Sequence, residues 1–255
     1  MVDEVLAKSF TLTGADYDRY RPGFPPAAAD MVMPPTVRTA LDLAAGTGKF
    51  TELLVGRAQR VIAVEPSESM LEILRSKLPE VEAYLGSAER IPVESGVADI
   101  VTVAQAFHWF DEDAACAEIS RVLRPGGTLG LVWNRFDPMC GWDRAAHRIA
   151  HPGLASASAS ADADADAAVA TSTAADELPG FDFVRREHIH STERIRRAAY
   201  LGRWSTVSTF LVADEVARTE MFDAIEAVLD SDPETRDREE YDLPIVTDVF
   251  VYRRT

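Results

Sequence analysis

From residue 39 onward, short apolar runs alternate with amphipathic stretches along the chain. Apolar runs bounded by turn residues predict buried strands, and the amphipathic stretches between them predict helices. This alternation is typical of βαβ units, which build a mainly parallel sheet with helices on both faces. The runs place five strands at residues 39–43, 60–65, 82–85, 99–104 and 128–134.

Three helices are expected between these strands, at residues 49–57, 67–77 and 114–123. The last of them is followed by Arg124-Pro125-Gly126-Gly127. Proline and glycine stop a helix and turn the chain, so this helix is expected to lead directly into the strand at 128–134.

Two segments of different character flank this core. The stretch around Tyr20-Arg21-Pro22 favours an extended turn, and residues 27–33 favour a short helix, which together form a prefix placed to cover a site. Residues 154–175 are almost entirely Ala, Ser, Asp and Thr, with few large apolar groups to offset the entropy lost on ordering. We therefore expect a mobile or loosely helical connector there.

The C-terminal part predicts two more strands, at 183–189 and 243–252, and helices at 192–201 and 214–229. The total is seven strands, and we expect the final pair to complete the same sheet because neither half alone closes a core. The chain is predicted to be one α/β domain with a small cap. It divides into a prefix (1–38), a core (39–136), the connector (154–175) and C-terminal strands with cap helices (181–255).

Composition and charge narrow the class of partner. The formal net charge of −16 argues against a broad surface for nucleic acid or anionic membrane. No apolar run approaches the roughly 20 residues of a membrane helix, and the first ten residues lack the pattern of a secretion signal. We therefore expect a cytoplasmic protein with a small-molecule partner; its oligomeric state has no signal here. The two cysteines, Cys116 and Cys140, favour buried apolar packing over a disulfide framework or a metal site.

The strongest local motif is Leu41-Asp42-Leu43-Ala44-Ala45-Gly46-Thr47-Gly48-Lys49-Phe50, a strand that turns through two glycines into a helix. Glycine permits a tight turn, and a helix N-terminus offers free N–H groups to an anionic ligand. An ordinary strand-to-helix turn and a dinucleotide fingerprint are the alternatives. The fingerprint is weakened because Thr51 stands where its third glycine would be. Glu65 ends the next strand, where a carboxylate can accept hydrogen bonds from both hydroxyls of a ribose.

Five motifs follow one another in a characteristic order, and the chain carries them at Asp42-x-Ala44-x-Gly46-Thr47-Gly48, Glu65-Pro66-Ser67-x-x-Met70, Gly86-Ser87-Ala88-Glu89-x-Ile91-Pro92, Asp99-Ile100-Val101 before Gln105 to Phe110, and Arg121 to Gly127. Residues 41–134 thereby resemble the Rossmann-like core of class I S-adenosylmethionine-dependent methyltransferases, in the type 11 subgroup. The prefix and the His108-Trp109-Phe110 run resemble the trans-aconitate methyltransferase-like branch.

The resemblance implies S-adenosyl-L-methionine as the cofactor and assigns residues to its parts. Glu65 would bind the ribose, Pro66 or Met70 would flank the adenine, and Ser87, Ala88 and Glu89 would contact the adenine edge. The methionine moiety would be held by Asp42, Ala44, Gly46, Gly48, Ala104 and Gln105. This sequence departs from the pattern in two places: Ala44 replaces the commonest first glycine, a mild change if its backbone is ordinary, and Ser87 replaces a frequent aspartate.

Candidate catalytic and acceptor residues lie around the core. His108, just beyond the fourth strand, is a candidate general base, with a loop-fixing role as the alternative. Aromatic faces attract cations, which makes Tyr17 and Trp109 candidates beside the sulfonium, with simple packing as the alternative. Arg21 and Arg135 are candidate clamps for a carboxylate. Trp204 is expected either in an acceptor cap or in the core.

The leading hypothesis is methyl transfer from S-adenosylmethionine to a small molecule, with O-methylation of a carboxylate or hydroxyl favoured. Such an enzyme mainly aligns the acceptor and excludes water, because the methyl group is already activated. Two alternatives remain: an NAD(P)-dependent oxidoreductase on a similar sheet, and a non-catalytic protein that binds S-adenosylmethionine.

Overall fold

The computed structural model describes residues 18–151 and 177–255, and a single sheet organises them. Its strand order is β3-β2-β1-β4-β5-β8-β7-β6. The parallel part consists of β1 (Thr39–Leu43), β2 (Arg60–Glu65), β3 (Glu82–Leu85), β4 (Ala98–Ala104) and β5 (Leu123–Phe136). The antiparallel part consists of β8 (Glu240–Arg254), β7 (Phe181–Arg196) and the two-residue β6 (Glu177–Leu178).

Helices cover both faces of the parallel part. One face carries α3 (Pro26–Val32), α4 (Thr51–Leu54) and α5 (Glu68–Lys77), and the other carries α6 (Glu112–Val122) after the short 3₁₀ helix η2 (Phe107–Trp109). Capping residues fix where these helices begin: Ser67 accepts a hydrogen bond from the Met70 N–H, and Asp111 accepts one from the Ala114 N–H. Each face buries its own apolar cluster against the sheet.

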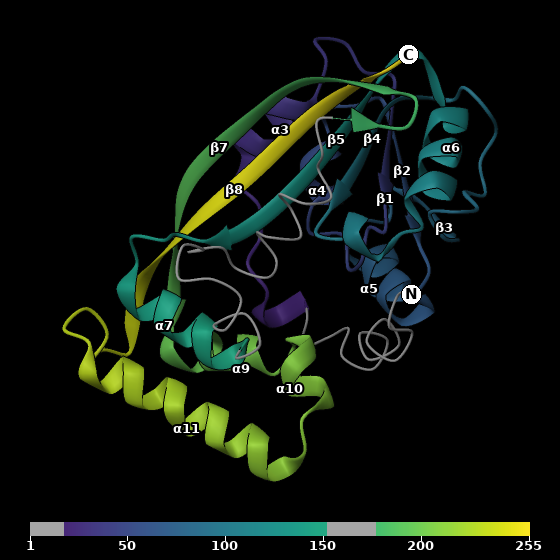
Figure 1. Cartoon of the computed structure of the whole chain (residues 1–255). Helices are drawn as coiled ribbons and strands as arrows, with labels where there is room; N and C mark the ends of the chain where they lie inside the picture. The colour runs from purple at the N-terminus through teal and green to yellow at the C-terminus, as the bar shows by residue number, and fades with distance from the viewer. Residues whose placement is uncertain (1–17, 152–176) are drawn as a thin grey trace.

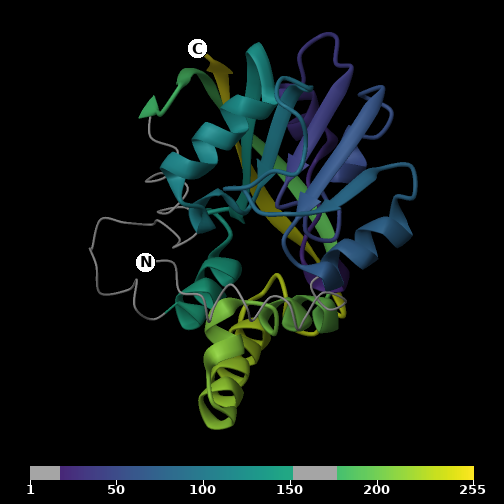
Figure 2. The same cartoon turned by 90° about the vertical axis from the view of Figure 1, so that its right-hand side faces the viewer.

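The long antiparallel strands β7 and β8 extend beyond the parallel part of the sheet and lead to a group of helices that we call the cap (Figure 1). The cap contains α7 (Gly141–Ala150), α9 (Arg197–Trp204), α10 (Ser208–Val212) and α11 (Glu215–Ser231). It has its own apolar cluster, which includes Trp142, Tyr200, Trp204, Phe210 and Tyr241. Figure 2 shows the cap helices gathered beneath the sheet. The cap is therefore a second packed unit of the fold, and it faces the lower end of the sheet in this view.

The predicted Rossmann-like α/β class is confirmed, and all seven predicted strands form. The two-residue β6 is additional. The helix predicted at 192–201 was wrong in its first half, because residues 192–196 continue β7 and pair with β8 from Pro244 to Glu240. The helix predicted at 49–57 shortens to the four residues of α4. The predicted connector at 154–175 lies outside the described residues.

Two further findings concern the cysteines and the helices. Cys116 and Cys140 are both buried free thiols, and burial raises the pKa of each to about 12. In the described ranges, every helix is too short or too polar to cross a bilayer.

Candidate functional site

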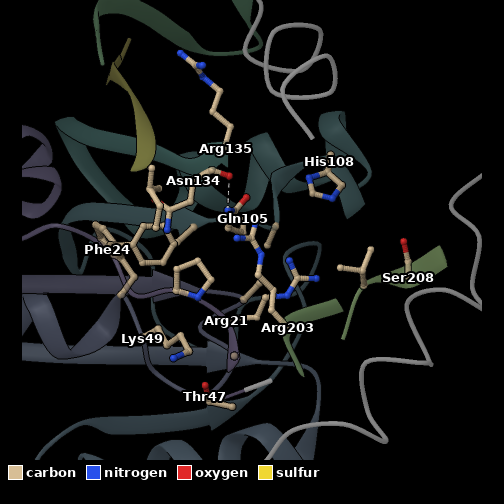
Figure 3. Close-up of a pocket in the computed structure, with 18 of the residues that line it drawn as sticks. Arg21, Phe24, Thr47, Lys49, Gln105, His108, Asn134, Arg135, Arg203 and Ser208 are labelled. Carbon is tan, nitrogen blue, oxygen red and sulfur yellow. Dashed lines mark hydrogen bonds between the residues drawn. The ribbon is translucent and has the colours of Figure 1, made fainter. Parts of the chain in front are cut away.

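A cavity of about 220 Å³ lies between the carboxyl ends of the parallel strands and the cap (Figure 3). This is the edge at which open α/β folds place their sites. Its sheet side is lined by residues at or just after the carboxyl ends of β1, β2, β4 and β5, and its cap side by residues of α7, α9 and the start of α10. The prefix contributes Arg21, Pro22 and Phe24. Twelve of the predicted site residues line it: Arg21, Asp42, Ala44, Gly46, Glu65, Met70, Ala104, Gln105, His108, Trp109, Arg135 and Trp204.

The turn after β1 has three residues in the left-handed backbone region. Their φ angles are +54° at Ala44, +57° at Gly46 and +87° at Gly48. The sequence expectation that Ala44 is a mild replacement required an ordinary backbone there, and this condition is not met, because an L-residue is strained at positive φ. A Cβ at Gly48 would lie 3.1 Å from Leu74 and from Leu78. Gly48 therefore lets the turn approach α5 closely and does not line the cavity.

Glu65 ends β2 and joins the two loops that border the cavity. One of its carboxylate oxygens accepts the Gly46 N–H at 2.8 Å and the other accepts the Ser67 N–H at 2.9 Å. Burial raises the pKa of Glu65, while these two backbone hydrogen bonds lower it. A carboxylate has about four acceptor sites, so two remain for other donors. Glu65 is thus fixed in orientation and keeps accepting capacity on the cavity side.

Asp42 lies inside the sheet below the turn. Its two oxygens accept hydrogen bonds from the hydroxyls of Thr51, at 2.6 Å, and Thr102, at 2.7 Å. Burial raises its pKa to about 6 against the opposing effect of those hydrogen bonds. Asp42 therefore ties β1 to α4 and β4 from within, and it also reaches the cavity wall.

The residues predicted around the adenine are divided by the structure. Met70 lines the cavity, whereas Pro66, Ser87, Ala88 and Glu89 are not among its lining residues. Ala88 is buried in the core cluster, and Glu89 accepts a hydrogen bond from the Asp111 N–H at 3.2 Å. The predicted Tyr17 lies outside the described residues.

Gln105, directly after β4, has φ +58°. Its amide nitrogen donates to the Asn134 carbonyl at 2.9 Å, and the Asn134 side chain donates to the Gly23 carbonyl at 2.8 Å. The Thr247 hydroxyl on β8 donates to the side-chain oxygen of Asn134 at 2.6 Å. One asparagine therefore connects the prefix, the sheet and the strained residue Gln105. Such backbone strain concentrates at functional sites.

His108 and Trp109 follow on η2 and reach the cavity from the side opposite Lys49 (Figure 3). Their ring centroids are 4.7 Å apart, with the planes tilted by 47°. The structure thus brings the base candidate and the aromatic candidate to one wall of the cavity.

The two predicted arginine clamps are held differently. Arg21 donates from Nε to the Thr206 hydroxyl at 2.9 Å and from Nη2 to the Thr206 carbonyl at 3.0 Å. Arg135 donates from Nε to the buried Asp248 at 2.9 Å, and Asp248 also accepts from His188. Figure 3 shows the Arg135 guanidinium pointing away from Arg21 and Gln105. The clamp role of Arg135 stays a prediction, and its guanidinium is already paired with Asp248.

The cap side brings together polar residues that the sequence analysis did not select. Asp143, His147 and Arg203 are buried and line the cavity beside Trp204, which is fully buried in the cap cluster. Asp143 and His147 are four residues apart on α7, a spacing that places two side chains on one helix face. This spacing was the one feature of the sequence that could have pointed to Asp143 and His147. No such feature pointed to Arg203, because its partners are on another helix. Lys49 also lines the cavity and was not predicted as a site residue. Burial lowers the pKa of its ammonium group.

Residues 41–131 match the family model described as a methyltransferase domain. An uncharacterized methyltransferase of Mycobacterium tuberculosis is 50% identical over 139 residues, which cover 54% of this chain and 57% of that protein. An uncharacterized methyltransferase-like protein of Schizosaccharomyces pombe is 39% identical over 154 residues, covering 58% and 60%. The chain thus spans less than two thirds of the length of these relatives.

Among solved structures, a candidate type II methyltransferase of Anaeromyxobacter dehalogenans is 26% identical, with a TM-score of 0.68 over 92% of this chain and 97% of that one. The class to which fold, motifs and comparisons point is that of Rossmann-like methyltransferases, because residues 41–131 match a methyltransferase domain and the sheet has the fold of the similar solved structure. The cofactor of this class is S-adenosylmethionine, which confirms the cofactor predicted from the sequence.

Proposed function

We propose that this protein transfers the methyl group of S-adenosylmethionine to an oxygen atom of a small-molecule acceptor. The supporting observation is the continuity of the cavity. It runs from Glu65 and Gly46 on the sheet side to Arg203 and Trp204 on the cap side. A cofactor on the sheet side would therefore face an acceptor enclosed by the cap.

The residues present fit the cofactor. Glu65 offers its two remaining acceptor sites to the ribose hydroxyls, and its existing bonds to Gly46 and Ser67 hold it ready. Gly46, Ala104 and Gln105 line the same side and are assigned to the methionine moiety. Arg21 is assigned to the methionine carboxylate, which a guanidinium binds through paired hydrogen bonds. The Tyr20-Arg21-Pro22 prefix also supports the trans-aconitate methyltransferase-like branch.

Bound S-adenosylmethionine supplies a methyl group already activated by its sulfonium. The chain's own contribution is to orient the acceptor and exclude water, and the buried cap residues Trp204 and Val207 and the prefix residue Phe24 provide an apolar enclosure for this. A carboxylate acceptor needs no base. For a hydroxyl acceptor, His108 stands at the cavity wall to take the proton.

The test is calorimetric titration with S-adenosylhomocysteine and, separately, with NAD. We expect S-adenosylhomocysteine to bind and Glu65→Gln to weaken that binding by about tenfold to a hundredfold, because a charged acceptor contributes about 1.5–3 kcal/mol. Glu82→Gln is the matched control, because the Glu82 carboxylate forms an exposed salt bridge with Arg60 on the neighbouring strand. Its affinity should equal that of the wild type.

Two results would contradict the proposal. Tight NAD binding without S-adenosylhomocysteine binding would indicate the oxidoreductase alternative. Cofactor binding with no methylated product from a panel of carboxylates, phenols and amines would favour the non-catalytic alternative.

A further inference from the structure

The part of the cavity wall that carries His108 and Trp109 is a single 3₁₀ turn, η2, and such a short turn has little stability of its own (Figure 3). It lies between Gln105, whose φ is +58°, and the start of α6. Its first residue, Phe107, is 2% exposed and is anchored in the core. The position of its other end therefore depends on how α6 begins.

The N-terminal cap of α6 is incomplete within the helix's own sequence. Asp111 is the N-cap residue and accepts the Ala114 N–H at 3.1 Å, but the alanine side chain cannot accept a hydrogen bond from the Asp111 N–H in return. Glu89 supplies this acceptor from the loop after β3, since one of its carboxylate oxygens accepts the Asp111 N–H at 3.2 Å. It also places negative charge at the positive end of the helix. The capping box is thus completed by a residue 22 positions earlier in the chain.

Glu89 can act as an anchor because its loop is fixed to α6 at a second place. Glu118 of α6 accepts the Ile91 N–H at 2.9 Å. Arg121 of α6 donates to the carbonyl oxygens of Ile91 and Val93, both at 2.8 Å. Glu118 and Arg121 also pair with each other at 2.6 Å. The loop therefore holds α6 both at its first turn and further along the helix.

The same loop begins beside the residue that we assign to the cofactor ribose. The Gly86 N–H donates to the Glu65 carbonyl oxygen at 3.2 Å, so the start of the loop is fixed to the end of β2. Seen from the sheet, the loop runs from Glu65 to the first turn of α6, directly after η2. The sheet side of the cavity and its His108 wall are thus joined by one short segment.

We propose that Glu89 is a positioning residue of the methyl-transfer site: by completing the cap of α6 it holds η2, and with it His108 and Trp109, at the cavity wall. This inference rests on the proposed methyltransferase function and adds a residue that acts on that site from outside it. The role differs from the contact with the adenine edge that the family resemblance implies for Glu89. Glu89 is exposed and is not among the residues that line the cavity.

The direct test is the indole N–H resonance of Trp109 in ¹H–¹⁵N NMR spectra of the protein without ligand. It is assigned by its absence in Trp109→Phe, and internal references are the indoles of three buried residues, Trp133, Trp142 and Trp204. We expect Glu89→Ala to shift or broaden the Trp109 resonance while the references stay in place. Glu89→Gln should restore most of the wild-type position, because its amide oxygen can still accept a hydrogen bond. A Trp109 resonance that is unmoved in Glu89→Ala would overturn the proposal.

Hydrogen exchange gives a second readout. The Asp111 amide should exchange about threefold to tenfold faster in Glu89→Ala than in the wild type, as expected when one hydrogen bond is lost. Glu94→Ala is the matched control, because it removes the same charge from an exposed position of the same loop that does not line the cavity. The control should leave both readouts as in the wild type. Equal effects of the two substitutions would mean that charge alone matters, against the positioning role.

Calorimetry with S-adenosylhomocysteine separates this proposal from the proposed function. Failure of the wild type to bind this ligand would contradict the function, whereas the NMR and exchange measurements need no ligand and still decide the role of Glu89. An affinity loss in Glu89→Ala with an unmoved Trp109 resonance would assign Glu89 to the adenine edge and refute the positioning role.

A shorter acid keeps the proposal testable if Glu89→Ala does not fold. Glu89→Asp retains the charge and shortens the reach of the carboxylate by one methylene group, so it should shift the Trp109 resonance as well. If Glu89→Asp leaves that resonance in its wild-type position, the hydrogen bond to Asp111 does not hold the wall.

Discussion

Asp42 shows how one buried group below the turn after β1 contributes to stability. Its pKa of about 6 lies above the value of about 3.9 in an unfolded chain. The folded state therefore binds the proton more tightly than the unfolded state. The stabilisation that comes from this proton is fully present below about pH 4 and is lost as the pH rises through about 6.

We predict that Asp42→Asn, which mimics the protonated form, gains stability relative to the wild type as the pH rises. The gap should grow by about 2–3 kcal/mol between pH 4 and pH 7, since one pKa unit corresponds to about 1.4 kcal/mol. Urea unfolding at several pH values measures it. Glu82→Gln is the contrasting control, because Arg60 lowers the pKa of Glu82, so its smaller effect has the opposite sign. A gap for Asp42→Asn that does not change with pH would refute this role.

At the scale of elements, α3 packs on the sheet where β5 has no side chain. A Cβ on Gly130 would lie 2.7 Å from a methyl carbon of Val32 and 2.8 Å from its Cβ. Val32 is buried, so it has little room to give way. The prefix helix therefore depends on this one glycine for its distance from the sheet.

We predict that Gly130→Ala destabilises the protein by about 1–3 kcal/mol, the usual cost of overpacking a core. Val32→Ala alone should also destabilise, because it leaves a cavity. The double variant should be more stable than the sum of the two effects predicts, by about 1 kcal/mol, since each change makes room for the other. Strict additivity in urea unfolding would show that the two positions do not press on each other.

The strands and the turn after β1 could be predicted because their causes are local. The apolar runs that predicted β1, β2, β4 and β5 are largely buried in the sheet, whereas β3 at the sheet edge is partly exposed, and glycine spacing alone located the turn at Gly46. Residues 192–196 were assigned to a helix because an amphipathic pattern there does not reveal the pairing of β7 with β8. Arg203 was not found because its contact with His147 joins residues 56 apart in the sequence. Tertiary contacts of this kind leave no periodic signal.

At the scale of the whole molecule, the cavity is assembled from distant parts of the chain. Arg21 of the prefix contacts Thr206 of the cap, 185 residues later, and Asn134 of β5 contacts Gly23 of the prefix. Gly202 on α9 leaves space for the Tyr20 ring, because a Cβ there would lie 2.7 Å from it. Prefix, sheet and cap are therefore joined around the cavity, and a change in the cap should be felt by a ligand on the sheet side.

We predict that Thr206→Val, which keeps the shape of the side chain and removes its hydroxyl, weakens S-adenosylhomocysteine binding by about threefold to tenfold. Arg21 loses the acceptor of its Nε donor and so is held less firmly toward the cofactor carboxylate, and one hydrogen bond is worth about 1 kcal/mol. Thr235→Val is the matched control, because that hydroxyl is equally buried and bonds to Leu229 away from the cavity. Calorimetric affinities that are equal for the two variants would mean that the cap does not position Arg21 for the cofactor.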